Sequence, residues 1–300
     1  MNLVVEGDTA AARRIRPARA LAAAVLTRAP GLRPSAEKLA WRTFYELANL
    51  GRRDIGAALM NYGYAGLADA AAGDDGDDDR DRYGRALYRT VAGAVDLKGR
   101  DLLEVGCGRG GGTAHLADVM HPRSVTGLDL ARRAVARAQR RYSRPGLRFI
   151  AGDAEELPFA DASFDALLTV ESTHCYSDTV RFLREARRVL RPGGVLLLAD
   201  FRHAVLPAGA DEALVPQEDL ATLRRQIGEA GFAVEQEEDI TANVVRALQL
   251  DTPRRRAQIE RRVPGPLRQH ALGFAAIEGS PMYEAFAQRR WTYVRVVARR

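Results

Sequence analysis

Apolar residues between positions 97 and 203 fall into short runs, each of a length that suits one buried strand. The runs are DLLEVG, SVTGLDL, LRFIAGDA, FDALLTVES and GVLLLADF. Between them, helical patterns predict helices over residues 113–120, 131–142 and 179–190. Strands and helices that alternate at this spacing are typical of a parallel sheet covered on both faces. The RVLRPGG segment agrees, because a proline and two glycines are expected to end the third helix just before a strand.

The pattern continues with one more helix and two more strands. PQEDLATLRRQIGEAGF predicts a helix that stops at Gly231, FAVEQEEDI a strand, and RRWTYVRVVARR an edge or penultimate strand. Residues 241–285, between these strands, predict loosely amphipathic helices broken by the prolines at 253, 264, 266 and 281. We therefore expect an α/β fold with a doubly wound, mostly parallel seven-stranded sheet and a helical lid at about 241–285.

The first third of the chain has a different character. Residues 1–35 are rich in alanine and arginine and contain prolines, which predicts a basic and poorly ordered N-terminus. Apolar residues at helical spacing follow from Glu37 to Met60, and the acidic GDDGDDDRD run reads as a solvated loop. The expected organisation is a flexible segment (1–35), a helical cap (36–95) and the α/β domain (96–300).

Composition excludes several classes of protein. The net charge of +6 is carried mainly by arginines dispersed through helices of alternating charge, which disfavours a nucleic-acid partner but leaves anionic substrates or a membrane surface open. No apolar run approaches the ~20 residues of a membrane-spanning helix. The two cysteines, Cys107 and Cys175, form no C-x-x-C pair, so we expect no zinc site or disulfide and a cytoplasmic location. A homo-oligomer remains compatible with the sequence.

The LLEVGCGRGGG segment carries the first chemical signal, because it joins a strand to a helix through a glycine turn. Gly106, Gly108 and Gly110 allow backbone torsions and close approaches that other residues resist. A ligand can then lie against the loop and the exposed N–H groups of the helix start. Asp129, at the end of the next strand, is suited to binding ribose hydroxyls. Together these residues predict a nucleoside site at the switch point of the sheet.

Two cofactors fit this arrangement so far. The loop satisfies G-x-G-x-x-G, and Asp129 lies 23 residues beyond Gly106, which is close to the dinucleotide-binding pattern of nicotinamide dehydrogenases. Glu104 instead completes E-x-G-x-G-x-G. In GDAEELPF, Asp153 follows the third strand, where a carboxylate can accept from an adenine amine.

Five motifs, in register over about residues 97–202, resemble the class I S-adenosylmethionine methyltransferases: the loop, the ribose acid, the adenine acid, SFDAL and RVLRPGG. The resemblance implies a Rossmann-like methyltransferase fold with S-adenosylmethionine as cofactor. It places at the cofactor Glu104, Gly106, Gly108, Gly110, Asp129, Leu130, Asp153, Ala154 and Glu171. In MNYGYA, which resembles a segment that folds over the cofactor in relatives, Tyr64 is expected either to contact the methionyl carboxylate or to pack on the lid.

The stretch VESTHCYSD follows the fourth strand, and Asp200 ends the fifth. Because the carboxyl ends of parallel strands share one edge of the sheet, His174 and Asp200 are able to approach each other there. A neutral imidazole suits removal of an alcohol proton, and a carboxylate suits holding its tautomer. We expect His174 as general base and Asp200 as its partner; the alternative is a histidine that only fills a turn.

The segment ESTHCYSD and the residues up to DFR resemble the natural-product sugar O-methyltransferases, in which a histidine and an aspartate at these positions form a catalytic dyad. Four short motifs extend the resemblance to the actinobacterial phthiotriol/phenolphthiotriol dimycocerosate methyltransferases. They are GGG after the glycine loop, HP before the second strand, PGL before the third and HCY after the fourth. The resemblance implies O-methylation of a hydroxyl on a polyketide, lipid or related secondary metabolite. C-methylation of an enol or alkene, and a cyclase of the same fold, remain alternatives. So does a divalent ion shared by Glu171, His174 and Asp200, although we expect no metal.

Overall fold

The computed structural model of the chain describes residues 59–67, 81–204, 218–263 and 265–300. The predicted flexible segment at 1–35, almost all of the predicted helix at 37–60 and nearly all of the acidic loop lie outside the described residues.

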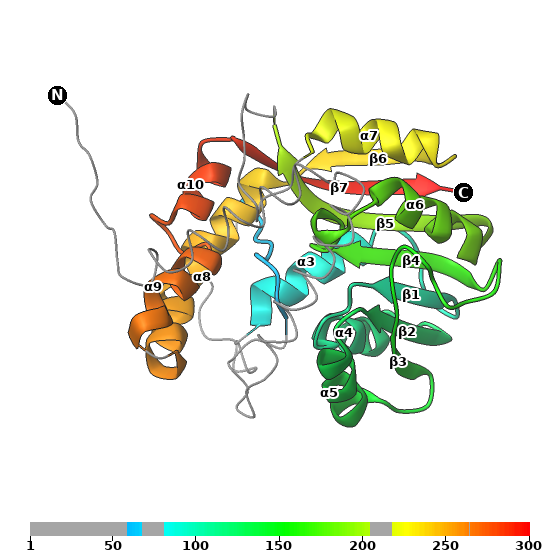
Figure 1. Cartoon of the computed structure of the whole chain (residues 1–300), viewed down its shortest axis with the longest axis horizontal. Helices are drawn as coiled ribbons and strands as arrows, with labels where there is room; N and C mark the ends of the chain where they lie inside the picture. The colour runs from blue at the N-terminus through cyan, green and yellow to red at the C-terminus, as the bar shows by residue number, and fades with distance from the viewer. Residues whose placement is uncertain (1–58, 68–80, 205–217, 264) are drawn as a thin grey trace, which may run out of the picture.

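One mixed sheet organises the described chain (Figure 1). Its seven strands lie in the order β3-β2-β1-β4-β5-β7-β6, and only β7 runs antiparallel to its neighbours. The strands are β1 (Asp101–Val105), β2 (Ser124–Asp129), β3 (Leu147–Ala151), β4 (Phe164–Val170), β5 (Leu190–His203), β6 (Ala233–Asp239) and β7 (Trp291–Arg299). This confirms the predicted fold class, and β7 is the penultimate strand that the C-terminal alternation indicated.

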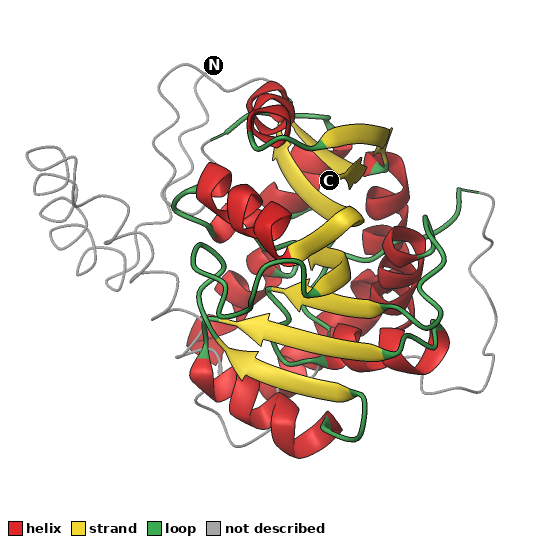
Figure 2. Cartoon of the chain, turned by 90° about the vertical axis from the view of Figure 1, so that its right-hand side faces the viewer, coloured by secondary structure: helices red, strands yellow, loops and turns green. Residues whose placement is uncertain are grey.

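Helices cover both faces of the sheet (Figure 2). Alternation along each strand explains this arrangement, because successive side chains point to opposite faces. Leu102 belongs to an apolar cluster with residues of α3 (Arg82–Ala92), α4 (Gly111–Val119) and α5 (Arg132–Tyr142), whereas Leu103 packs with residues of α6 (Thr179–Val189) and α7 (Leu220–Glu229). Both leucines are fully buried.

Three further helices, α8 (Thr241–Arg262), α9 (Gly265–Phe274) and α10 (Pro281–Ala287), lie together on one side of the molecule (Figure 1). They occupy the predicted helical insert between β6 and β7. The expectation that Pro253 breaks this region is wrong, because Pro253 lies inside α8. The neighbouring Thr252 hydroxyl donates to the carbonyl of Leu248, within the turn that the proline cannot close itself. Pro281 occupies the first turn of α10, where the missing N–H costs nothing.

A second correction concerns the RPGG segment. It was expected to separate α6 from the next strand, but β5 already begins at Leu190, which pairs with Phe164 across an irregular register. The C-terminal residues explain the extension, since Arg299 and the backbone N–H of Arg300 donate to the carbonyls of Gly193 and Gly194. Within the described residues, no helix is long and apolar enough to cross a bilayer.

Candidate active site

The glycine loop connects β1 to α4 at the carboxyl edge of the sheet. Gly106, Gly108 and Gly110 all have φ between 52° and 82°, in the left-handed region that favours glycine. A Cβ on Gly106 would lie 2.4 Å from the Cβ of Ser172, and one on Gly110 would collide with Phe149. A Cβ on Gly108 would meet only the terminal methyl of Met60, at 3.4 Å. Two glycines therefore serve internal packing, whereas a Cβ at Gly108 would only come into van der Waals contact with the tip of the Met60 side chain.

Glu104 holds this loop from beneath. Its carboxylate is fully buried, with one oxygen accepting from the Tyr88 hydroxyl at 2.6 Å and the other from Thr113 at 2.5 Å. Burial raises the pKa of Glu104 to about 7, although the two hydrogen bonds act in the opposite direction and lower it. Because both oxygens are engaged by α3 and α4, Glu104 acts on the predicted cofactor site through the loop that it supports. Tyr88 also explains the third glycine of GGG, since a Cβ on Gly112 would lie 2.0 Å from its ring.

Two more carboxylates stand at the ends of β2 and β3. Asp129 accepts from the backbone N–H of Gly108 through Oδ2 and from that of Ala131 through Oδ1, each at 2.8 Å. Asp153 is half-buried and accepts from the N–H of Glu155 at 2.9 Å. Of the residues that follow them, Leu130 is half-buried and Ala154 is buried.

This edge of the sheet fits a nucleoside. The Asp129 carboxylate is fixed beside Gly108, the loop glycine at which an added Cβ would meet only the tip of the Met60 side chain. Asp129 and Asp153 are only partly buried, so a ligand is able to reach both carboxylates. The two carboxylates beside the glycine loop therefore suit the cofactor that the sequence predicts.

His174 and Asp200 meet at the neighbouring strand ends. His174 lies in a short 3₁₀ turn, η3 (Thr173–Cys175), directly after β4, and Asp200 lies in β5. Nδ1 of the imidazole is 2.8 Å from Oδ1 of Asp200, and the backbone N–H of His174 donates to Oδ2 at 3.0 Å. Thr173 also donates to Oδ2. The turn is therefore fastened to Asp200 at three points, which fixes the plane of the imidazole.

The electrostatics of this pair favour an ion pair. Burial raises the pKa of Asp200, but the charges of His174 and Arg202 outweigh it and hold that pKa well below its usual range. Burial lowers the pKa of His174, whereas Cys175 and Asp200 raise it, and the net result is well above the ordinary value. The surroundings of the pair thus favour the imidazolium over the neutral imidazole, and only the neutral form of His174 acts as a base.

Glu171 completes the cluster from the end of β4. Its φ of 48° is unusual for a residue with a side chain, and such backbone strain is often found at functional sites. Oε1 accepts from the Tyr62 N–H at 2.7 Å and from the Tyr293 hydroxyl at 2.9 Å. Burial raises the pKa of Glu171 to about 7, in opposition to both hydrogen bonds. The structure thus places Glu171 beside the dyad, tied to two elements far away in sequence.

Tyr64 belongs to residues 59–65, which contact the glycine loop through Met60 and Glu171 through Tyr62. Tyr64 is half-buried and packs against the apolar core, while its N–H donates to the carbonyl of Tyr83 at 3.0 Å.

Several residues that shape the site carried no signal in the sequence. They support loops through side-chain hydrogen bonds: Tyr88, Thr113, Glu155, Ser172, Thr173, Arg202 and Tyr293. Glu155 is an example, since its carboxylate accepts from Ser177 and from the N–H of Asp178 and so joins the Asp153 loop to the His174 loop. In the sequence, Glu155 is only one of several acidic residues in GDAEELPF. Its burial, 6 % exposed, could not be foreseen.

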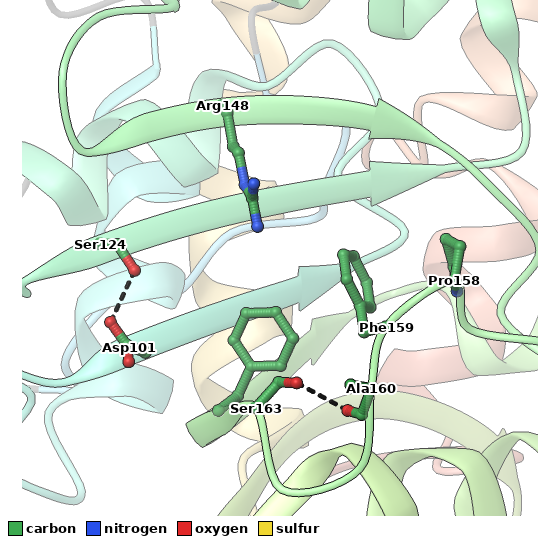
Figure 3. A pocket seen from close by; sticks show the side chains of 8 residues that line it. Asp101, Ser124, Arg148, Pro158, Phe159, Ala160 and Ser163 are labelled. Carbon is green, nitrogen blue, oxygen red and sulfur yellow. Dashed lines mark hydrogen bonds between the residues drawn. The ribbon is translucent and has the colours of Figure 1, made fainter.

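A cavity of about 350 Å³ lies elsewhere, at the amino edge of the sheet (Figure 3). Asp101 and Ser124, at the starts of β1 and β2, form part of its lining, together with Arg148 and Phe159. It is separate from the cluster of carboxylates, whose residues follow the opposite strand ends. Within the described ranges, no group of three or more His, Cys, Asp or Glu side chains is arranged to hold a metal ion.

The chain is similar in sequence to known methyltransferases. Residues 103–198 match the methyltransferase domain family. The phthiotriol/phenolphthiotriol dimycocerosates methyltransferase 1 of Mycobacterium ulcerans is 37 % identical over 77 % of this chain and 80 % of its own. The fatty-acid O-methyltransferase of Mycolicibacterium smegmatis is 34 % identical over 76 % of this chain and 79 % of its own.

Solved structures share the fold. The cyclase SpnF superposes with a TM-score of 0.62 at 26 % identity, over 80 % of this chain and 87 % of its own. A geranyl diphosphate C-methyltransferase of Streptomyces coelicolor, in complex with S-adenosyl-L-homocysteine, superposes with a TM-score of 0.65 at 16 % identity, over 88 % and 98 % of the two chains. At that identity the second likeness concerns the fold alone.

Proposed function

The chain belongs to the class I S-adenosylmethionine-dependent methyltransferases, and from this premise we propose that it methylates a hydroxyl oxygen on a polyketide, lipid or related secondary metabolite. S-adenosylmethionine is its cofactor. The acceptor class is inferred from relatives named for dimycocerosate lipids and fatty acids.

The observation that carries the proposal is the contact between His174 and Asp200. With Nδ1 held 2.8 Å from the carboxylate, Nε2 is the nitrogen that accepts the proton of the acceptor hydroxyl. Asp200 then stabilises the imidazolium that forms. Positioning contributes as well, since the fastened η3 turn fixes the direction from which the hydroxyl approaches.

The remaining residues hold the cofactor, which supplies an electrophilic methyl group bound to a sulfonium. Gly106, Gly108 and Gly110 shape the loop, Glu104 supports it, and the Asp129 carboxylate is placed for the ribose. Asp153 and the adjoining Ala154 line the adenine end, and Leu130 follows the ribose acid. Glu171 and Tyr64 close the side nearest the dyad. These roles are part of the proposal.

A base at this position favours an alcohol over a carboxylic acid as the acceptor. An alcohol is a weak nucleophile until its proton is removed, whereas a carboxyl group has a pKa of about 4 and is already ionised at neutral pH. A fatty acid would therefore gain little from His174. A buried imidazole paired with Asp200 is useful only when a proton has to leave the acceptor.

The test is incubation of the purified protein with methyl-labelled S-adenosylmethionine and a matched acceptor panel. The panel contains a long-chain secondary alcohol, the corresponding fatty acid and an enolisable polyketide analogue, and mass spectrometry identifies the methylated atom. Ether formation from the alcohol supports the proposal. A methyl ester alone would redirect it to carboxyl methylation, and a new C–CH₃ bond would establish the C-methyltransferase alternative.

A second candidate is a cyclase that binds the cofactor without transferring its methyl group. The 26 % identity to the cyclase SpnF, over 80 % of this chain, favours keeping it. In that case the acceptor panel yields no labelled product, although the protein still binds S-adenosylhomocysteine.

We also propose the domain organisation expected from the sequence: a basic N-terminal segment (1–35), a helical cap (36–95) and the methyltransferase domain (96–300) with the insert at about 241–285 as a lid. The partner is a small or lipid-like acceptor and not a nucleic acid. We also propose a cytoplasmic location, since Cys107 and Cys175 form no C-x-x-C pair in the sequence.

A further inference from the structure

Residues 59–65 form a strap across the carboxyl edge of the sheet. At one end, the terminal methyl of Met60 lies over the open side of Gly108. Two residues further on, the N–H of Tyr62 donates to Oε1 of Glu171 at 2.7 Å. In Figure 1 the strap is the blue segment that runs between α8 and α3. It thus joins the glycine loop to the carboxylate beside the dyad.

The strap is irregular in structure, so something outside it has to fix its path. Gly63 has a φ of 90° and packs so closely on Tyr83 that a Cβ would lie 2.8 Å from the Cβ of that residue. No helix or strand satisfies the carbonyls of Asn61 and Tyr62. Buried backbone carbonyls need donors, and these two find theirs in a single side chain.

That side chain is Arg255 of α8. Its Nη2 donates to the carbonyl of Asn61 at 3.1 Å and to that of Tyr62 at 3.0 Å. Nη1 reaches the carbonyl of Ala275, just after α9, at 3.1 Å. Only 14 % of the Arg255 side chain is exposed. One guanidinium therefore binds the strap and the end of α9 at the same time.

Asp251, one turn earlier in α8, fixes the orientation of this guanidinium. Its carboxylate is 2.7 Å from Nε of Arg255 and is itself buried, with 5 % of the side chain exposed. Arg254 binds the same carboxylate from the other side. Arg255 is thus held in place before it meets the strap, which reduces the side-chain entropy lost in binding the two carbonyls.

We propose that Arg255 is a positioning residue for the cofactor site, which it acts on by fixing the strap against Gly108 and Glu171. The path runs from the guanidinium to the carbonyl of Tyr62, and from the N–H of the same residue to Glu171. The insert helices are in this way coupled to the site where the methyl group is transferred. The inference rests on the cofactor site of the proposed function and is independent of the acceptor.

The geometry requires arginine. The three nitrogens of one planar group bind four partners: Nη2 the two neighbouring carbonyls, Nη1 a third carbonyl and Nε a carboxylate. A lysine ammonium carries charge but cannot span these partners, because its donors lie on a single atom. Arg255→Lys therefore keeps part of the function, and Arg255→Ala loses all of it. Arg256 is exposed on the same helix and provides the matched control.

The experiment combines calorimetric titration with S-adenosylhomocysteine and hydrogen exchange of the full chain. For Arg255→Ala we expect the Kd for S-adenosylhomocysteine to rise about tenfold, since hydrogen bonds from a charged donor are lost. Arg255→Lys should give a rise of about threefold. Arg256→Ala should bind as the wild type does. In the alanine variant the amides of residues 60–65 should exchange at least about tenfold faster than in the wild type.

Asn243 supplies a second route to the same result. Its side-chain amide donates to the carbonyl of Ala65 at 3.0 Å, at the other end of the strap. Asn243→Ala should also speed exchange in residues 60–65, and it tests the strap even where Arg255→Ala fails to fold.

The possible outcomes are distinguishable. If the wild type does not bind S-adenosylhomocysteine, the proposed function fails. If the wild type binds and Arg255→Ala binds equally well, this inference is overturned. Exchange that accelerates throughout α8, α9 and β7, with no excess in the strap, would make Arg255 an ordinary structural residue and would overturn it too.

Discussion

The imidazole of His174 is the group on which the proposed chemistry depends. If it removes the acceptor proton, His174→Ala should lower kcat by about 10²–10⁴ with an alcohol acceptor. The affinity for S-adenosylhomocysteine should stay within about twofold, because the glycine loop and Asp129 are untouched. Initial rates with labelled cofactor and a titration with S-adenosylhomocysteine measure the two quantities. Unchanged kcat would reduce His174 to a residue that fills a turn.

The pH dependence of the reaction follows from the same pair. Cys175 and Asp200 hold the pKa of His174 well above its ordinary value, and only the neutral imidazole accepts a proton. We therefore expect kcat/KM to rise with pH through that elevated pKa. In Asp200→Asn the anionic partner of the imidazolium is lost, so the rising limb of the kcat/KM profile should move to lower pH while its plateau falls. If the rising limb of the kcat/KM profile lies at the same pH in Asp200→Asn as in the wild type, Asp200 does not raise the pKa of His174 and the proposed dyad is contradicted.

At the scale of elements, Glu104 joins β1 to α3 and α4. Burial raises its folded pKa from 4.5 to about 7, so its contribution to stability is fully present below pH 4.5 and is lost as the pH rises through 7. A shift of this size corresponds to on the order of 3 kcal/mol. Thermal unfolding of the wild type and Glu104→Gln, between pH 5 and 8, tests it. The wild type should lose stability relative to Glu104→Gln as the pH rises; parallel curves would show that Glu104 does not titrate there.

The order of elements was predictable because each strand is a separate apolar run and each helix has its own period. The ends of helices and strands were harder to predict from the sequence where contacts with residues far away in sequence determine them. The start of β5 at Leu190 depends on pairing with Phe164 and on donors from the C-terminus, none of which lies near it in sequence. α8 continues through Pro253, and the neighbouring Thr252 hydroxyl accepts from the N–H of Glu278, which is 26 residues away.

The same distinction applies to the site. His174 and Asp200 could be paired from the sequence, because parallel strands bring their carboxyl ends to one edge. The partners of Glu171 could not, since Tyr62 lies 109 residues before it and Tyr293 lies 122 residues after it, on elements whose placement no local pattern fixes. Burial, which decides the pKa of both Glu104 and Glu171, is likewise a property of the assembled fold.

At the scale of the whole molecule, the two edges of the sheet are chemically distinct. The carboxyl edge carries the loop glycines, Asp129, the dyad and the strap, whereas the amino edge carries the cavity near Asp101 and Ser124. A ligand that binds the carboxyl edge makes contacts with separate segments of chain at once. Such a ligand should therefore stabilise the fold as a unit and suppress local opening at the carboxyl edge more than at the amino edge.

Saturation with S-adenosylhomocysteine at about 100 times its Kd should stabilise the protein by about 2.7 kcal/mol, which raises the Tm by several degrees. Hydrogen exchange should slow most in residues 59–65, 104–110 and 129–131, and less at the starts of β1 and β2. NADH is the control, because the glycine loop also satisfies the dinucleotide pattern. Protection by NADH alone would show that the loop binds a dinucleotide. Protection that centres on the amino-edge cavity would move the cofactor to the opposite side of the sheet, and the strap, Glu171 and the dyad would then lie too far away to act on it.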